Sequence, residues 1–154
     1  RSDRPIGRAH ERNRPESAGR EPELRMTVQA QIERPRVLLV EDDSGVRRSI
    51  QLLLQARGYD VRAFSSASLA LADPAASDAA CLVTDYRMDG MDGAELLRSL
   101  RAAGWSRPAI LITAHRTDFV VAMEYETCFD AALERPLLDH RLLTCVDRAT
   151  GRGG

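Results

Sequence analysis

The chain has 154 residues, 44% of them apolar, which is enough to build one packed domain of ordinary size. Its formal charge is −1, so no global field recruits nucleic acid or an anionic membrane, and we expect neither as a partner. Its apolar runs are far shorter than a membrane span, and its first residues carry scattered Arg and Glu instead of an apolar signal core. We therefore expect a cytoplasmic protein that selects its partners through local surfaces.

The first part of the chain differs in composition from the rest. Residues 1–34 are rich in Arg, Glu, Pro and Gly and show almost no apolar periodicity, so they cannot bury a core. We expect a disordered tail there, with Met26 as a candidate natural start. The folded domain is predicted over residues 35–150, and residues 151–154 are expected to form a disordered end.

The cysteines indicate neither a disulfide framework nor a zinc site. Cys81, Cys128 and Cys145 are odd in number and contain no CxxC pair, which favours reduced thiols that pack as small apolar side chains. All basic residues of the chain are arginine. The absence of a lysine at any one position is therefore weak evidence about that position.

From Arg36 onward, short apolar runs alternate with helical periodicity, which is typical of a parallel sheet covered by helices on both faces. The expected strands are 37–40, 60–64, 81–84, 109–112 and 130–133. The first expected helix runs from Ser44 to about Gly58, and the second begins near Ser66. The third contains Leu96, Leu97 and Leu100 on its inner face and ends at Gly104. The last two cover residues 118–126 and 138–149. The pattern predicts a single α/β domain of five βα units.

Polar residues follow the ends of these predicted strands. Glu41, Asp42 and Asp43 follow the first strand, Asp85 ends the third, Thr113 follows the fourth and Arg135 follows the fifth. In an open α/β sheet, ligands bind beyond the carboxyl ends of the strands. If the first and third strands are neighbours, Glu41, Asp42 and Asp85 form a carboxylate cluster, which repels itself unless a hard cation enters.

The chemistry of this cluster indicates phosphoryl transfer. Oxygen ligands without nearby His or Cys select Mg²⁺, or Mn²⁺, over zinc, and Mg²⁺ commonly shares its coordination with a phosphate. Asp85 is then the candidate nucleophile, Thr113 a hydroxyl donor to a phosphoryl oxygen, and Arg135 a fixed positive charge. The alternative is that these acids serve only as helix caps and loop charges.

Five segments together resemble a response-regulator receiver domain: 37–43 (VLLVEDD), 82–88 (LVTDYRM), 91–93 (MDG), 111–114 (LITA) and 133–136 (LERP). The resemblance covers about residues 36–150. It implies a flavodoxin-like receiver fold, a five-stranded parallel sheet of order 2-1-3-4-5. It also implies a signalling module of two-component or phosphorelay pathways rather than an enzyme.

Carried over residue by residue, the resemblance makes Asp85 the phosphorylation site. Glu41 and Asp42 correspond to the acid pair that binds the metal with Asp85, and the backbone carbonyl of Arg87 completes that site. Thr113 corresponds to the switch hydroxyl. Arg135 stands at the place of the family's lysine. Arg87 and His115 occupy positions that line the phosphoryl pocket in receivers, with an ordinary exposed loop histidine as the alternative for His115. Asp89 is a further candidate for the pocket lining.

The sequence departs from the family at three positions. Arg135 replaces the lysine with a broader planar cation, Asp89 replaces a proline, and Ala132 replaces an aromatic switch residue. Phe129 and Tyr125 are the candidates to take over that aromatic role. These departures put the coupling between phosphorylation and the outer surface in doubt.

Two functions are compatible with the sequence. The first is a single-domain response regulator that receives a phosphoryl group from a histidine kinase or a phosphotransfer protein and signals by binding a further protein, as a monomer or weak homodimer. The alternative is a degenerate receiver that binds proteins independently of phosphorylation. A haloacid-dehalogenase-type phosphatase is disfavoured, because it needs a second Asp where Arg87 stands.

Overall fold

The computed structural model describes residues 34–114 and 129–152. Within this part of the chain, five parallel strands form one sheet in the order β2-β1-β3-β4-β5, as predicted. The strands are β1 (Arg36–Val40), β2 (Asp60–Phe64), β3 (Cys81–Asp85), β4 (Ala109–Thr113) and β5 (Ala131–Glu134). The predicted α/β class and the receiver-like strand order are both confirmed.

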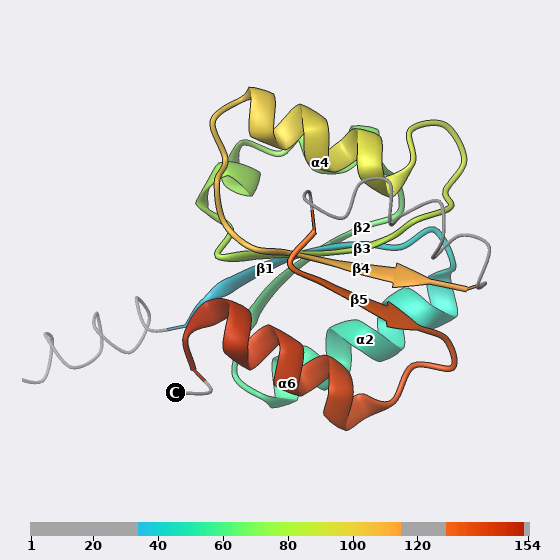
Figure 1. Ribbon diagram of the computed structural model, residues 1–154, viewed down its shortest axis with the longest axis vertical. Helices are drawn as coiled ribbons and strands as arrows, with labels where there is room; N and C mark the ends of the chain where they lie inside the picture. Colours follow the sequence, from blue (N-terminus) through green and yellow to red (C-terminus); the bar gives the residue numbers. More distant parts are fainter. Residues whose placement is uncertain (1–33, 115–128, 153–154) are drawn as a thin grey trace, which may run out of the picture. The chain divides into compact units, whose positions relative to one another are not determined.

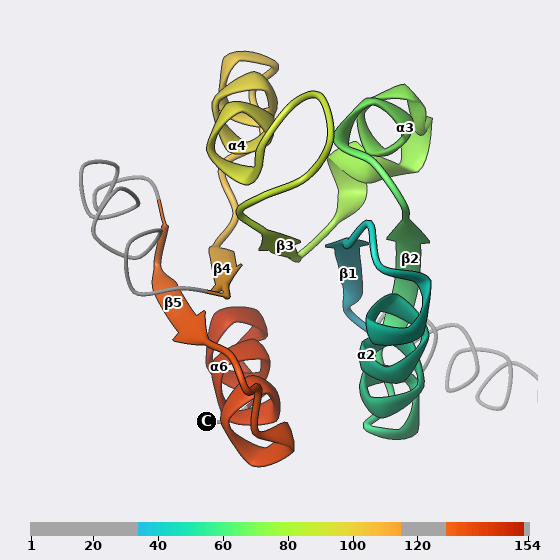
Figure 2. The same cartoon turned by 90° about the vertical axis from the view of Figure 1, so that its right-hand side faces the viewer.

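Helices cover both faces of this sheet (Figure 1). Figure 2 shows α3 and α4 on one face and α2 and α6 on the other. These helices are α2 (Ser44–Ala56), α3 (Ala67–Ala72), α4 (Gly93–Ala102) and α6 (Asp139–Thr150), and a short 3₁₀ helix, η2 (Pro74–Asp78), follows α3. Among the described residues, no helix is both long enough and apolar enough to cross a bilayer.

The central strands are mainly apolar because both of their sides are buried. In β1, Val37 and Leu39 pack into the core on the side of α2 and α6, whereas Leu38 and Val40 pack into the core on the side of α3 and α4. Side chains alternate along a strand, so a continuous apolar run fills two cores at once. The sheet is therefore held from both faces, which fixes where its strands end.

Short connections and helix caps then place the functional loops. The side chain of Asp43 accepts a hydrogen bond from the backbone N–H of Val46 (2.9 Å), so that α2 begins after only three residues that follow β1. Asp92 caps α4 in the same way. At Gly93, the position of a Cβ atom would lie 2.4 Å from the carbonyl oxygen of Asp85. Only glycine allows α4 to begin this close to the end of β3.

The element boundaries differ from the predictions by one or two residues, and one prediction about the C-terminal end differs more. Gly151 closes α6 in the left-handed conformation, and the backbone N–H of Arg152 donates to the carbonyl of Asp147 (2.8 Å). The expected disordered end therefore does not include these two residues. The predicted tail up to residue 33, the predicted helix over 118–126, Cys128, and residues 153–154 lie outside the described residues.

Candidate functional site

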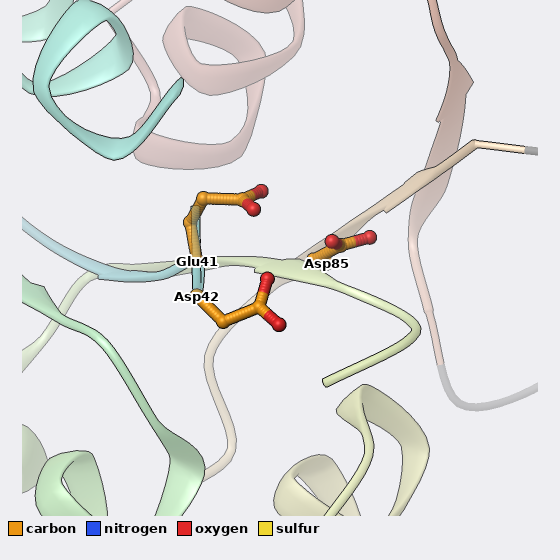
Figure 3. A group of neighbouring side chains, drawn as sticks. All are labelled: Glu41, Asp42 and Asp85. Atoms are coloured by element: carbon orange, nitrogen blue, oxygen red, sulfur yellow. The ribbon is translucent and has the colours of Figure 1, made fainter. Parts of the chain in front are cut away.

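Three carboxylates meet at the carboxyl ends of β1 and β3 (Figure 3). Glu41, Asp42 and Asp85 each offer an oxygen atom, and these atoms lie within 4.8 Å of one another. The register explains this closeness, because Val40 of β1 pairs with Thr84 of β3, which puts Glu41 beside Asp85. The sheet topology thus gathers the acids that the strand-end pattern had singled out.

Glu41 is the most buried of the three, at 1% exposure. Its carboxylate accepts hydrogen bonds from the backbone N–H of Asp43 (3.2 Å) and from the guanidinium of Arg135. Burial and the nearby charge of Asp85 nevertheless raise the pKa of Glu41 to about 7. The two hydrogen bonds oppose this shift without cancelling it.

Asp85 ends β3 and is 8% exposed. Burial raises its pKa above the ordinary value and the charge of Asp42 adds to the shift, whereas Arg135 and the backbone N–H of Tyr86 oppose it. The guanidinium of Arg135 lies 3.4 Å from the Asp85 carboxylate. Asp85 is therefore a buried acid whose charge is only partly balanced.

Asp42 and Asp43 are adjacent acids with different surroundings. Asp42 is exposed and belongs to the carboxylate cluster. Asp43 caps α2 through its side chain. Of the three consecutive acids after β1, Glu41 and Asp42 thus face Asp85, while Asp43 serves the helix.

Arg135 and Thr113 border the cluster from the ends of β5 and β4. Arg135 contacts both Glu41 and Asp85, and its Nε atom is buried without a hydrogen-bond partner within the described part of the chain. Thr113 is fully buried, and its carbonyl accepts a hydrogen bond from the backbone N–H of Arg135 (2.9 Å). This backbone hydrogen bond holds Thr113 and Arg135 next to each other beside the acids.

An open cavity adjoins the cluster on the side of Asp42. Its volume is about 520 Å³, and its lining includes Arg87 and Asp89, both exposed. A metal-binding role for the Arg87 carbonyl stays a prediction, and His115 lies outside the described residues. The remaining lining residues are Tyr86, Met88, Gly90 and Asp92.

The aromatic switch position also has a defined surrounding. Ala132 is exposed on β5. Phe129 is partly buried and packs against the core beneath α3 and α4, which places an aromatic ring near the start of β5. Tyr125, the other candidate for the aromatic role, lies outside the described residues.

The residues present fit a hard divalent cation. All three cluster ligands are carboxylate oxygens, the donor type that Mg²⁺ and Mn²⁺ prefer, and no nitrogen or sulfur ligand joins them among the described residues. Burial, and after it the charge of a neighbouring acid, raises the pKa of Glu41 and of Asp85 although Arg135 opposes the shift, so the ionised form of the metal-free cluster is disfavoured. A cation in this cluster would stabilise that ionised form.

Sequence reasoning did not find two features of the structure. The first is Arg47 of α2, whose guanidinium donates to the backbone carbonyl of Glu41 (2.9 Å). The second is buried Asp147 of α6, which accepts hydrogen bonds from Arg57 (2.6 Å) and from the Tyr59 hydroxyl. The helix dipole disfavours both charges, because Arg47 is a cation near the start of α2 and Asp147 is an anion near the end of α6. That mismatch is a signal that the sequence alone contains.

The fold and the strand-end acids together define a class of protein. The family model of the response regulator receiver domain matches residues 37–147. The chain therefore belongs to the response regulator receiver domain family, which serves signal transduction in two-component systems.

Particular relatives agree with this assignment. The transcriptional regulatory protein FixJ of Azorhizobium caulinodans is 36% identical over 117 residues, which are 75% of this chain and 55% of that protein. The C4-dicarboxylate transport transcriptional regulatory protein DctD of Rhizobium meliloti is 35% identical over 118 residues, 75% of this chain and 25% of that protein. This chain thus matches about half of the first relative and a quarter of the second.

Solved structures show the same fold. The crystal structure titled FixJ-N superposes with a TM-score of 0.67 at 32% identity and covers 76% of this chain and 94% of its own. The response regulator StyR superposes with a TM-score of 0.68 at 31% identity, covering 77% of this chain and 60% of its own.

Proposed function

We propose that this chain is a receiver that accepts a phosphoryl group on Asp85 in a Mg²⁺-dependent reaction and signals by binding a partner protein. One observation carries the proposal: the oxygen atoms of Glu41, Asp42 and Asp85 lie within 4.8 Å of one another, with Arg135 in contact with two of these acids. A phosphoacceptor needs a nearby cation site and a fixed positive charge, and this cluster offers both.

In the proposed reaction, a carboxylate oxygen of Asp85 attacks the phosphorus atom of a phosphohistidine. The P–N bond breaks, the imidazole leaves with its electron pair and takes up a proton, and an aspartyl phosphate forms on Asp85. Arg135 balances charge on the transferred group, and Thr113 donates its hydroxyl to a phosphoryl oxygen.

Glu41, Asp42 and Asp85 would hold the metal ion, with the Arg87 carbonyl as a further ligand. When bound, Mg²⁺ neutralises the acids and the phosphoryl oxygens so that an anionic donor can approach. Mn²⁺ satisfies the same oxygen donors. His115 and Asp89 complete the proposed pocket lining.

The phosphodonor is proposed to be a histidine kinase or a phosphotransfer protein, as is usual for receivers. We also propose that residues 35–150 form the functional unit, acting as a single-domain signalling module rather than an enzyme. The mass of the native protein on an immunoblot of its host tests the single-domain assignment. The melting temperature of a variant that lacks residues 1–25 tests the domain boundary.

Labelling by a small phosphodonor tests the phosphorylation site. Intact mass spectrometry of the chain treated with acetyl phosphate and MgCl₂ should show one added phosphoryl group, and EDTA should prevent the addition. Asp85→Asn should remove it, whereas Asp43→Asn serves as the control and should retain it. Labelling of the Asp85→Asn variant at parental level would contradict the proposed site.

The degenerate receiver remains the second candidate, and a specific contact favours it. Arg135 pairs with Glu41, so an internal cation occupies one of the acids that a metal ion would use. Under this alternative the parent protein takes up no phosphoryl group from acetyl phosphate at any MgCl₂ concentration, yet still binds its partner.

A further inference from the structure

The loop that carries the metal-binding acids begins with a buried backbone carbonyl. The pairing of β1 with its two neighbours ends at Val40, so Glu41 lies just beyond the regular strand ladder. The N–H of Glu41 donates to the carbonyl of Phe64 (3.1 Å). Because Glu41 is 1% exposed, its own carbonyl needs a partner within the protein.

Arg47 supplies that partner. Its Nη1 atom donates to the Glu41 carbonyl at 2.9 Å, and its side chain is half-buried. Arg47 lies three residues after the start of α2, where the positive end of the helix disfavours a cation, and no acid in that first turn compensates. The contact with Glu41 accounts for a cation at this unfavourable place.

Holding this carbonyl has a geometric consequence for the next residue. The Glu41 carbonyl and the Asp42 N–H belong to one planar peptide unit, so fixing the carbonyl fixes the plane from which Asp42 departs. Asp42 is exposed, whereas Glu41 is held by hydrogen bonds from Asp43 and Arg135. The backbone is thus the main determinant of where the Asp42 carboxylate points.

We propose that Arg47 is a positioning residue for the cation site: by binding the Glu41 carbonyl, it orients Asp42 toward Asp85. This inference rests on the proposed function, since it presumes that the carboxylate cluster binds Mg²⁺. It assigns to a basic residue the role of strengthening the binding of a cation.

The sign of the effect separates positioning from simple electrostatics. Removing a positive charge near a divalent cation should by itself strengthen cation binding. Removing a positioning contact should weaken it, and loss of such supporting contacts typically costs metal affinity about 10-fold or more. The two explanations therefore predict opposite changes for the same variant.

Calorimetric titration of the full chain with MgCl₂ tests the proposal. Arg47→Met, which keeps the apolar stem, should bind Mg²⁺ about tenfold more weakly than the parent. Arg47→Lys, which keeps a donor, should recover most of the affinity. Arg48→Met removes the same charge from the next, exposed residue and should bind Mg²⁺ as tightly as the parent or slightly more tightly.

Affinity of Arg47→Met equal to or higher than that of Arg48→Met would overturn the proposal. If circular dichroism shows Arg47→Met to be unfolded, Arg47→Leu, which also lacks a donor, replaces it with the same expectation. A parent protein that binds no Mg²⁺ would contradict the proposed function itself, and this inference with it. A parent that binds Mg²⁺ together with an unaffected Arg47→Met would overturn this inference alone.

Discussion

Buried carboxylates lie at both ends of the strands, a pair at one end and a single acid at the other, and they differ in how their charge is balanced. At the carboxyl ends, Glu41 and Asp85 have a raised pKa, because burial and neighbouring acids outweigh the hydrogen bonds they receive. At the other end, Asp147 is 5% exposed. Burial also acts to raise its pKa, but hydrogen bonds from Arg57 and Tyr59 outweigh burial and lower it.

The comparison shows that burial alone does not decide whether an acid is structural or functional. Asp147 joins α6 to Arg57 and Tyr59, and Arg152 lies over the Tyr59 ring (4.9 Å), so the network stabilises the fold as it stands. At Glu41 and Asp85, by contrast, burial and neighbouring acids outweigh the hydrogen bonds and Arg135, so the ionised form of the cluster costs stability. Retaining such a destabilising arrangement is typical of a functional site.

The largest expected effect on stability is at Asp147. Asp147→Ala leaves the buried Tyr59 hydroxyl without its partner and removes the ion pair with the more exposed Arg57, so we expect the free energy of unfolding to fall by roughly 2 kcal/mol in a urea titration. Asp78→Ala is the control, because Asp78 is exposed and makes an ion pair at 3.8 Å; its change should stay within about 0.5 kcal/mol. Equal effects at the two positions would show that Asp147 contributes no more to the fold than an exposed acid does.

The next largest effect concerns the two adjacent acids after β1. Asp42→Ala should weaken Mg²⁺ binding at least about tenfold, because Mg²⁺ takes few protein carboxylates directly. Asp43→Ala should lower the unfolding free energy by about 1 kcal/mol through loss of the helix cap, with little change in Mg²⁺ affinity. Calorimetric titration and urea unfolding of both variants provide the measurements. Similar Mg²⁺ affinities for both would contradict the assignment.

The pH dependence of the two groups should run in opposite directions. The pKa of Glu41 is raised from 4.5 to about 7 on folding, so the folded protein binds this proton more tightly than the unfolded chain does. Its contribution to metal-free stability is therefore complete below pH 4.5 and is lost as the pH rises through about 7. The pKa of Asp147 is lowered, so its contribution is present above 3.8 and is lost as the pH falls further.

Urea titrations of the metal-free chain across these two pH intervals measure both effects. In Glu41→Gln, the free energy of unfolding should no longer change with pH in the upper interval, whereas its change in the lower interval should stay as in the parent. Because Mg²⁺ competes with the Glu41 proton, its affinity should also rise between pH 5 and 8. If the free energy of unfolding of Glu41→Gln still falls with pH in the upper interval, a group other than Glu41 titrates there.

The smallest expected effect is that of Arg135→Lys. Lysine keeps the charge but not the planar fork that reaches both Glu41 and Asp85. Arg135→Lys should thus retain Mg²⁺-dependent labelling and change the lifetime of the aspartyl phosphate only modestly. Arg135→Ala should shorten this lifetime more strongly or prevent the labelling. Dephosphorylation followed by mass spectrometry measures the lifetimes. Parental behaviour of Arg135→Ala would remove Arg135 from the site.

The sequence predicted the parts of this molecule that depend on local pattern. Apolar runs such as 37–40 located the strands because both sides of the sheet are buried. The acids at the strand ends were predicted because parallel strands bring their carboxyl ends to one edge. The resemblance to receivers supplied the strand order.

The parts that sequence reasoning missed depend on contacts between distant residues. Asp147 meets Arg57 and Tyr59 across about 90 positions of the chain, as the sequence separations of 90 and 88 show. The Arg47 contact joins a side chain to a backbone carbonyl. The pattern of residue types does not show which backbone carbonyls need a side-chain partner. The unfavourable charge of each residue within its helix was the only local signal of either contact.

The most direct test of this account is the free energy of unfolding of Asp85→Asn without metal ion, compared with the parent at pH 8. If the cluster retains unbalanced negative charge for function, removing the Asp85 charge should stabilise the protein, by about 1 kcal/mol. The same measurement on Asp147→Asn should show a loss of stability. If Asp85→Asn is instead less stable than the parent, the Asp85 carboxylate stabilises the fold as Asp147 does. That result would contradict a functional role for the buried charge of Asp85.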